Sequence, residues 1–338
     1  MMTAPIILDV LHMEASSRSR AETGYTIRAG HKKHWLEQDL PLSLFEKLLD
    51  AITAVAEVRF QGWGDPLANP DILAMLALAK KKGARAVLCT DAGRFTDAHA
   101  NALVRDGIDA VVFPLAGLTE DTNFRRRGTS LFAVLAAMDR LRTIQAVHEV
   151  NLPEVIVRYS LTRSGLLGHE LEELPRFLEG ISVRSALVRP LSYATSQHTE
   201  FDVIVPEDQA AYDRVAEAMR LAATDAAGRG IRLDCRLVHG GVSRFRCPDT
   251  PGSSLFLAAD GAVSPCPLRN VPLAGEATYR FHGQDVPFPH DVRGNLHTET
   301  LAAIWNEPDY REFRYKHDTD TPPEGCAGCW RSYLVPVK

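Results

Sequence analysis

Four of the six cysteines of this 338-residue chain lie in its last hundred residues, with a spacing that could bind metal. They are Cys247, Cys266, Cys326 and Cys329. The first two flank a predicted β-hairpin that turns at Asp260–Gly261, and the last two form a Cys-x-x-Cys pair. Four thiolates can hold a tetrahedral zinc ion or a [4Fe–4S] cluster. The spacing alone leaves both open, and it disfavours unrelated surface cysteines.

A second candidate site lies at the end of the second predicted strand, in the sequence "FQGWGDPL". It comprises Gly62, Trp63, Gly64 and Asp65. Glycines let a backbone approach a ligand closely, and a carboxylate can bind an ammonium group. The alternative is a tight turn between a strand and a helix, which also uses glycine and proline. Trp63, like Trp330, is expected to pack as a buried aromatic.

Other polar residues fall on predicted strands. Alternation places Arg158 and Ser160 on one face of the fifth strand, and a polar face inside a barrel needs partners or a ligand. These two, with Arg189 and Tyr193 near the sixth strand, are weaker candidates for a small-molecule pocket. Cys89 ends the third strand and is more simply a small buried hydrophobe. The run 125–127 of three arginines is expected to be solvated or to cap a helix.

The elements that position these residues alternate along residues 5–195. Strands are predicted over 6–13, 57–65, 84–90, 108–116, 154–162 and 182–193. Helices are predicted over 43–55, 70–83, 97–107, 131–147 and 170–181. Such β/α repetition predicts a parallel sheet, open or curled into a partial barrel. Function in these sheets collects at the carboxyl ends of the strands.

The pattern changes after residue 200. A long helix over 206–230 is expected to leave the barrel, and the remaining Pro, Gly, His and Cys-rich segment has little material for a core. Small units of this kind usually need a staple such as a metal. The predicted domains are a barrel over 1–200, a connecting helix and strand over 201–235, and a cluster domain over 236–338.

The C-terminal segment resembles a known family extension. Its features are "CPDTPGSSLFLAADGAVSPCPLRN", "GNL", "LAAIWN" and the final Cys-x-x-Cys pair, and together they resemble the SPASM/Twitch region of radical S-adenosylmethionine (SAM) enzymes. The resemblance implies one auxiliary [4Fe–4S] cluster on the four cysteines and favours iron–sulfur over zinc. Because no cysteine follows Cys329, the short, one-cluster Twitch form is expected.

The barrel segment resembles the same family. "FQGWGDPLANP" is similar to the glycine-rich strand end that contacts the methionine amino group of SAM, so Gly62, Trp63, Gly64 and Asp65 would hold that group. The fold implied is α/β, with a partial (β/α)6 barrel of radical SAM type followed by a small α+β Twitch/SPASM-like iron–sulfur domain.

The loop after the first strand departs from the family pattern. Active members have Cys-x3-Cys-x2-Cys there; the thiolates hold a cluster whose fourth iron chelates the amino and carboxylate groups of SAM. Glu14, Arg18 and Ala21 stand at these positions, and the first cysteine of the chain is Cys89. Radical cleavage of SAM by this chain alone is therefore not expected, and whether SAM binds is open.

The histidines around this loop offer another metal site, less favoured than an exposed basic stretch. The candidate ligands are His12, Glu14, His31 and His34. A His-x-x-His spacing suits a metal ion, but "GHKKHW" also reads as a solvated surface.

The function expected is a degenerate radical-SAM-like protein with one auxiliary cluster. It would act as partner subunit, electron relay or substrate-binding scaffold in peptide modification or cofactor maturation, beside an active radical SAM enzyme or a peptide or protein substrate. Alternatives are a SAM- or ligand-binding enzyme using the barrel pocket for non-radical chemistry, and a zinc-stapled binding module.

The composition bears on the partners and on the cellular location of the protein. A formal net charge of −5 and a pI near 6.2 argue against a nucleic-acid partner. No apolar run is long enough for a membrane helix, and the N-terminus lacks the pattern of a signal peptide. A cytoplasmic location is therefore expected, where thiols bind metal more often than they form disulfides.

Overall fold

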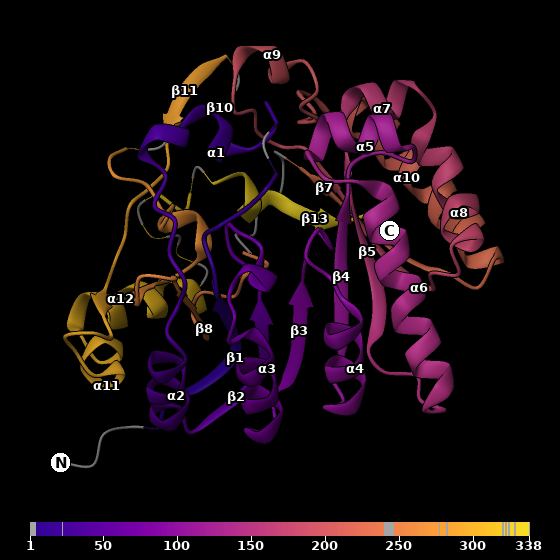
Figure 1. Ribbon diagram of the computed structural model, residues 1–338. Coiled ribbons are helices and arrows are strands. Elements are labelled where there is room, and N and C mark those ends of the chain that lie inside the picture. Colours follow the sequence, from indigo (N-terminus) through magenta and orange to yellow (C-terminus); the bar gives the residue numbers. More distant parts are fainter. Residues whose placement is uncertain are drawn as a thin grey trace.

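The computed structural model describes residues 5–21, 23–239, 247–276, 278–281, 283–319, 321, 323, 325–327 and 329–337. Within this part of the chain, one long sheet has the strand order β12-β9-β8-β1-β2-β3-β4-β5-β6-β7-β13. From β8 through β7, every neighbouring pair is parallel. The parallel strands stand side by side in Figure 1, with α2, α3, α4 and α6 along one face.

The six predicted barrel strands and the predicted hairpin strands are present, although the second strand lies earlier in the chain than predicted and four C-terminal strands were not predicted. Their bounds are β1 Ile7–Met13, β2 Ala54–Phe60, β3 Arg85–Cys89, β4 Ala110–Leu115, β5 Glu154–Leu161, β6 Ser185–Pro190 and β7 Arg232–Val238. The later strands are β8 Ser254–Leu257, β9 Ala262–Ser264, β10 Thr278–Phe281, β11 Gln284–Pro287, β12 Gly294–Asn295 and β13 Leu334–Pro336. All residues of β4 are buried, as a strand covered on both faces requires.

The described helices are α1 Ile27–Gly30, α2 Leu42–Ala51, α3 Ile72–Lys81, α4 Asp97–Arg105, α5 Glu120–Arg127, α6 Leu131–Val147, α7 Arg163–Leu167, α8 Glu170–Gly180, α9 Gln197–Glu200, α10 Gln209–Gly228, α11 Leu301–Trp305 and α12 Pro308–Asp318. Six of the described helices (α2, α3, α4, α6, α8 and α10) match the predicted ones in order, and the other six were not predicted. Short 3₁₀ turns cover Lys32–His34, Pro66–Ala68, Pro267–Arg269 and Trp330–Tyr333. Local sequence sets the ends: Thr96 caps α4, and Gly128, with φ of 70°, ends α5.

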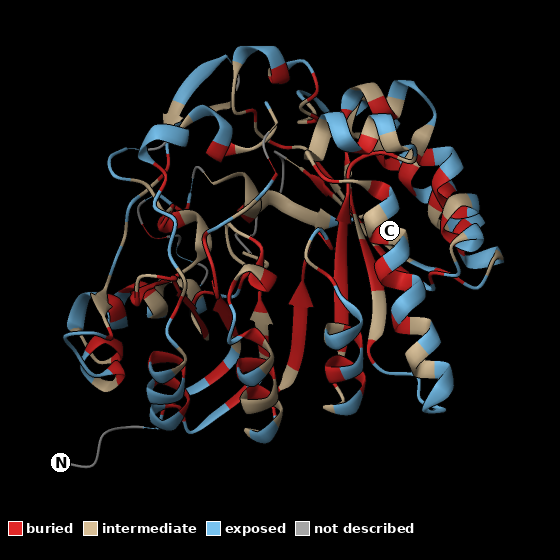
Figure 2. Ribbon diagram, in the orientation of Figure 1, coloured by how far each residue is buried: buried red, intermediate tan, exposed pale blue. Residues whose placement is uncertain are grey.

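The main core lies between the sheet and its helices. Figure 2 shows buried strands behind helices whose outer faces are exposed. Side chains from β2 and α2 meet there, with the rings of Phe45 and Phe60 edge to face at 5.8 Å. The opposite, inner face of the strands carries a smaller apolar cluster that includes Val87, Val112 and Ile156. Toward the carboxyl ends of the strands, polar side chains such as Arg158 follow this cluster and line a cavity.

The prediction that helix 206–230 leaves the barrel is wrong. α10 packs against α8, and the strand that follows it, β7, pairs in parallel with β6. The physical reason is the buried stripe of small and apolar residues on α10, including Ala216, Met219 and Ala222. A helix with such a stripe must cover another element. This segment therefore extends the α/β alternation by one more helix and strand.

The C-terminal region borders both edges of the parallel sheet. β8 pairs with β1 at one edge, and β13 pairs antiparallel with β7 at the other. The predicted hairpin is confirmed, because β8 and β9 are antiparallel and Gly261 turns between them with φ of 79°. Covering open edges removes unpaired backbone groups from water. None of the described helices is both long and apolar enough to cross a membrane.

A pair of phenylalanines tests where the core lies. Phe60 has no exposed surface, whereas Phe132 on α6 is 67% exposed. We expect Phe60→Ala to lower the free energy of unfolding by about 3–5 kcal/mol, and Phe132→Ala to change it by less than about 0.5 kcal/mol. Urea unfolding followed by circular dichroism measures both. Equal losses in the two variants would contradict this packing.

Candidate functional site

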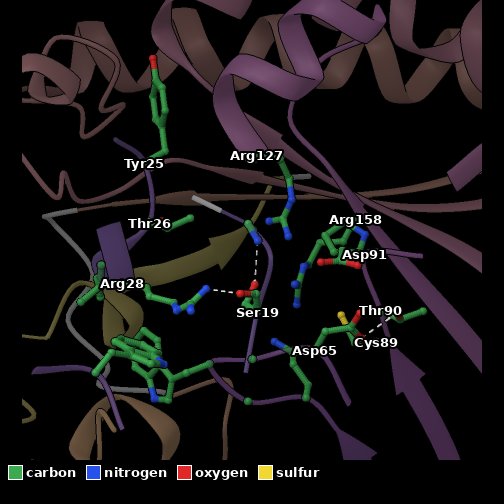
Figure 3. Close-up of a pocket in the computed structure, with 18 of the residues that line it drawn as sticks. Ser19, Tyr25, Thr26, Arg28, Asp65, Cys89, Thr90, Asp91, Arg127 and Arg158 are labelled. Atoms are coloured by element: carbon green, nitrogen blue, oxygen red, sulfur yellow. Dashed lines mark hydrogen bonds between the residues drawn. The ribbon is translucent and has the colours of Figure 1, made fainter. Parts of the chain in front are cut away.

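A cavity of about 260 Å³ opens at the carboxyl ends of the barrel strands. Its lining comes from the β2 turn, from residues after β3, from β5, from the end of α5 and from the segment after β1 (Figure 3). The predicted candidates Gly62, Trp63, Gly64, Asp65, Arg158 and Tyr193 are among these residues. Ser160 and Arg189 do not line it; Arg189 instead pairs with Asp234 at 2.9 Å.

The glycine turn after β2 lies directly against the opening loop. A Cβ at Gly62 would come within 2.5 Å of the Glu14 side chain, and one at Gly64 within 2.4 Å of the Ser16 carbonyl oxygen. The amide of Asp65 also donates to the Arg18 carbonyl at 2.8 Å. The glycines are thus required by the loop itself. In the family that the sequence resembles, this loop holds an iron–sulfur cluster. In this chain the loop packs against the glycine turn after β2.

Glu14 fastens this contact. Its side chain is buried, and its two carboxylate oxygens accept from the backbone amides of Trp63 at 2.8 Å and Ala259 at 3.2 Å. One carboxylate therefore joins the opening loop, the β2 turn and the β8–β9 hairpin. Burial, and more weakly the charge of Asp260, raise the pKa of Glu14 to about 7, although the two amide donors lower it.

Further hydrogen bonds hold the rest of the loop. The indole of Trp35 donates to the Ser17 carbonyl at 2.9 Å, and Asn69 donates to the Ala15 carbonyl at 2.7 Å. Arg18 pairs with Asp39 at 2.9 Å near the surface, whereas Ala21 lines the cavity. Glu14, Arg18 and Ala21, which stand where the family has cysteines, therefore lie in three different surroundings.

The alternative metal site at the loop is not formed. His12 is buried, burial lowers its pKa to about 4, and His34 is exposed. Across the described residues, no group of three or more His, Cys, Asp or Glu side chains is placed to hold a metal ion. The structure supports the alternative prediction that residues 30–34 form a largely exposed basic stretch.

Two carboxylates stand on one side of the cavity. Asp65 accepts from the Thr90 hydroxyl at 2.8 Å and from the Leu67 amide at 3.2 Å. Asp91, which follows β3, accepts from the Gly93 amide at 2.9 Å and lies beside Asp65. Burial, with the charge of Asp91 next, raises the pKa of Asp65 well above its ordinary value. Asp91 was not predicted; its place just after a strand end was the available signal.

Two arginines face these carboxylates. Arg127 ends α5 and Arg158 lies on β5, and in Figure 3 both side chains point toward the space between Ser19 and Asp91. Burial and the like charge of Arg158 lower the pKa of Arg127. The expectation that the arginine run is solvated is therefore wrong for Arg127. Helical spacing separates it from Arg125, which is exposed, and from Arg126, which pairs with Glu170 at 2.7 Å.

A second cavity, of about 320 Å³, contains all four predicted metal cysteines in its lining. Cys247, Cys266, Cys326 and Cys329 surround it together with Leu268, Val286, Phe288, Phe313 and Trp330. The thiols border an apolar space rather than converging on the position of one ion. Apolar surroundings with several thiols suit a compact iron–sulfur cluster.

Positive charge borders the same space. Arg269 donates to the Cys326 sulfur at 3.2 Å and pairs with Asp291 at 2.6 Å, and Arg331 pairs with Asp249 at 2.6 Å. Burial raises the pKa of Cys266 to about 12. Free thiolates are therefore costly here, and a metal group that binds them would remove that cost.

A wall of aromatic rings separates the two cavities. Trp63 and Tyr193 line the barrel cavity, while Phe288 and Trp330 line the cysteine cavity. Ring centroids lie 5.9 Å apart for Trp63 and Phe288, and 5.5 Å apart for Tyr193 and Trp330. Trp63 and Trp330 thus pack against other rings as predicted, although both are only partly buried. The wall fixes the positions of both cavities relative to each other.

Comparisons with known sequences match both parts of the chain. The sequence model of the Radical SAM superfamily matches residues 20–179, and that of the SPASM iron-sulfur cluster-binding domain matches residues 247–330. The PqqA peptide cyclase of Gluconobacter oxydans strain 621H is 24% identical over 291 residues, covering 82% of this chain and 70% of that protein.

Solved structures with the same fold include two that contain SAM. Streptococcus suis SuiB bound to S-adenosylmethionine has a TM-score of 0.64 at 14% identity, covering 93% of this chain and 68% of that one. Native anSMEcpe with bound AdoMet has a TM-score of 0.62 at 14% identity, covering 96% and 88%. These likenesses confirm the predicted α/β fold. The family of the C-terminal region rests on the match of residues 247–330 to the SPASM model.

The buried Glu14 carboxylate predicts a pH-dependent stability. Its pKa rises from 4.5 to about 7 on folding, so the folded state binds this proton more tightly and stability falls as pH rises from about 4.5 to about 7. The wild type should lose about 3 kcal/mol more over this range than Glu14→Gln. The exposed Glu46→Gln variant is the control and should follow the wild type. Identical pH profiles for Glu14→Gln and the wild type would contradict this role; urea unfolding at each pH measures them.

Proposed function

Because the chain belongs to the radical SAM superfamily and has a SPASM iron–sulfur region, we propose that it holds one auxiliary [4Fe–4S] cluster and does not itself cleave SAM to a radical. We propose further that it serves as a substrate-binding partner subunit in peptide modification. The observation that carries this proposal is the contrast between the two ends of the chain. Four cysteines line one cavity at the C-terminal end, whereas protein side chains fill the loop after β1.

The cysteine cavity fits the cluster. Cys247, Cys266, Cys326 and Cys329 would hold it, and when bound it supplies a one-electron redox centre. Arg269 and Arg331 would offset its negative charge, and the apolar lining would keep water away. Zinc is the alternative that four thiolates also allow, and the metal content of the protein distinguishes the two. A cluster bound by four thiolates has no iron left open for SAM or substrate.

The opening loop does not fit the radical-generating cluster. Glu14, Arg18 and Ala21 offer no thiolate, and Glu14 is already engaged with two backbone amides. Opening the loop for a cluster would break these hydrogen bonds and leave a buried carboxylate without donors, which is costly. No step through such a cluster is therefore assigned to this chain.

A peptide substrate is favoured because related proteins act on peptides or have been crystallised with them. The curated relative is a PqqA peptide cyclase, SuiB has been crystallised with the precursor peptide SuiA, and anSMEcpe with the Cp18Cys peptide. We therefore propose a peptide or protein as the partner, with a catalytic radical SAM enzyme completing the reaction.

A second candidate function is a ligand-binding enzyme that uses the barrel cavity for non-radical chemistry. It is favoured by the charged lining of that cavity, where Asp65, Asp91, Arg127 and Arg158 meet the thiol of Cys89. Turnover by the isolated chain, without any partner enzyme, distinguishes this candidate from the partner subunit.

Metal analysis tests the cluster. Protein purified without oxygen should contain about four irons per chain and absorb broadly near 400 nm. Cys326→Ser should lose most of that iron, because it removes a proposed ligand. Cys89→Ser is the matched control, a buried cysteine lining the other cavity, and should keep the full iron content.

The same preparations, chemically reduced and mixed with SAM, should release no 5′-deoxyadenosine. Zinc in place of iron would contradict the cluster, and cleavage of SAM by the chain alone would contradict its assignment as a partner subunit.

A further inference from the structure

One of the four proposed cluster ligands has a buried hydrogen-bond donor beside it. Arg269 ends the short turn that follows Cys266, and its backbone amide donates to the Cys266 carbonyl at 3.1 Å. Its side-chain Nη2 donates to the Sγ of Cys326 at 3.2 Å. Arg269 is 7% exposed, so this contact is shielded from water. One arginine is therefore fixed in the chain by one proposed ligand and directed at another.

The glycine before Cys326 leaves space for this guanidinium. A Cβ at Gly325 would lie 3.2 Å from Nη2 of Arg269, closer than an ordinary van der Waals contact. The backbone of Gly325 also has a φ of 75°, which side chains other than hydrogen rarely tolerate. The residue type at 325 therefore suits the close approach of Arg269 to the Cys-x-x-Cys segment.

A carboxylate and an aromatic ring hold the guanidinium on its other sides. Nη1 of Arg269 pairs with Asp291 at 2.6 Å, and Asp291 also pairs with Arg293 at 2.7 Å. The guanidinium carbons of the two arginines lie over the ring of Phe313, at 5.1 and 5.3 Å from its centroid. A guanidinium held in this way has little freedom left to lose. Its donor is therefore already directed at Cys326 in the protein itself.

The other arginine of the cysteine cavity is arranged differently. Arg331 pairs with Asp249 at 2.6 Å, and both residues line the cavity, so this pair presents opposite charges to it. Arg269 lines the cavity too, whereas its partner Asp291 is not among the described lining residues and lies behind the guanidinium. Arg269 therefore presents its positive charge to the cavity with its carboxylate partner on the far side.

We propose that Arg269 raises the reduction potential of the auxiliary cluster by donating a hydrogen bond to the ligating sulfur of Cys326. The inference rests on the proposed function, because it requires the cluster on the four cysteines. Arg269 is a positioning residue here, since it acts through Cys326.

The physical reason is the charge that reduction adds. One electron passes from an external reductant, which is oxidised, to the cluster, and no bond forms or breaks. The cluster and its thiolates then carry one more negative charge. A charge-assisted N–H···S hydrogen bond stabilises that charge, and hydrogen bonds to the sulfurs are among the factors that set the potential of iron–sulfur clusters.

A redox titration of the full chain tests the proposal. Protein purified without oxygen, its iron content measured first, is reduced stepwise with dithionite in the presence of mediators. Electron paramagnetic resonance of the reduced cluster gives the midpoint potential. Arg269→Met has a side chain of similar length without charge or donor, and Asp291 keeps Arg293 as its partner. This variant should retain its iron and lower the equilibrium constant for reduction about tenfold, a fall of about 59 mV for one electron.

Three further variants separate this role from a general loosening of the region. Arg269→Lys keeps the charge and a donor, and should recover part of the lost potential. Asp291→Asn should raise the potential above that of the wild type, because it removes a negative charge behind the guanidinium and keeps an oxygen that can accept from it. Arg311→Gln, exposed on α12, is the control and should leave the potential unchanged. Shifts of opposite sign at two neighbouring residues do not arise from misfolding.

An unchanged midpoint potential in Arg269→Met protein with full iron content would overturn this inference and leave the cluster proposal intact. Equal falls in Arg269→Met and Asp291→Asn would also overturn it, because the pair would then act only by supporting the fold. Wild-type protein that contains zinc or no metal would instead overturn the proposed function, and this inference with it.

Discussion

One buried carboxylate organises the part of the molecule where function is expected. Glu14 accepts hydrogen bonds from the Trp63 and Ala259 amides, and so joins the loop after β1, the glycine turn after β2 and the C-terminal hairpin. Gly62 has no room for a side chain because Glu14 lies against it, and Gly64 has none because the backbone of the same loop at Ser16 does. The loop therefore cannot be rearranged without disturbing both the barrel and the C-terminal region. At a position where the family has a cysteine, this chain therefore has a carboxylate that two backbone amides hold in place.

The two cavities then divide the remaining chemistry. The cysteine cavity is apolar, bordered by two paired arginines, and suited to a buried cluster. The barrel cavity is polar, with the carboxylates of Asp65 and Asp91 and the guanidinium groups of Arg127 and Arg158 in its lining. The aromatic wall, with Tyr193 and Trp330 at 5.5 Å, holds them close but separate. Under the proposed function, the barrel cavity would bind substrate next to a redox centre held in the cysteine cavity.

The sequence was sufficient for the barrel strands, their covering helices and the set of four cysteines around one cavity, because hydrophobic periodicity and cysteine spacing are local signals. The short helices and the last four strands carry no such periodic pattern and were not predicted. The sequence was insufficient where tertiary packing decides. The α10 helix was expected to leave the barrel, but its stripe of small residues packs on α8. Arg127 was expected in solvent, since three consecutive arginines look alike until helical spacing turns one of them inward. Asp91 was missed because one aspartate after a strand has no motif of its own, and the burial that pairs it with Asp65 is not visible in sequence.

The central claim is that iron chemistry has left the loop after β1 and is confined to the cysteine cavity. Electron paramagnetic resonance of the reduced, iron-loaded protein with and without SAM tests it most directly. A cluster bound by four cysteines has no open iron, so the account predicts one cluster signal that SAM does not alter. A signal whose g values shift when SAM is added would show an iron open to SAM and would contradict the account.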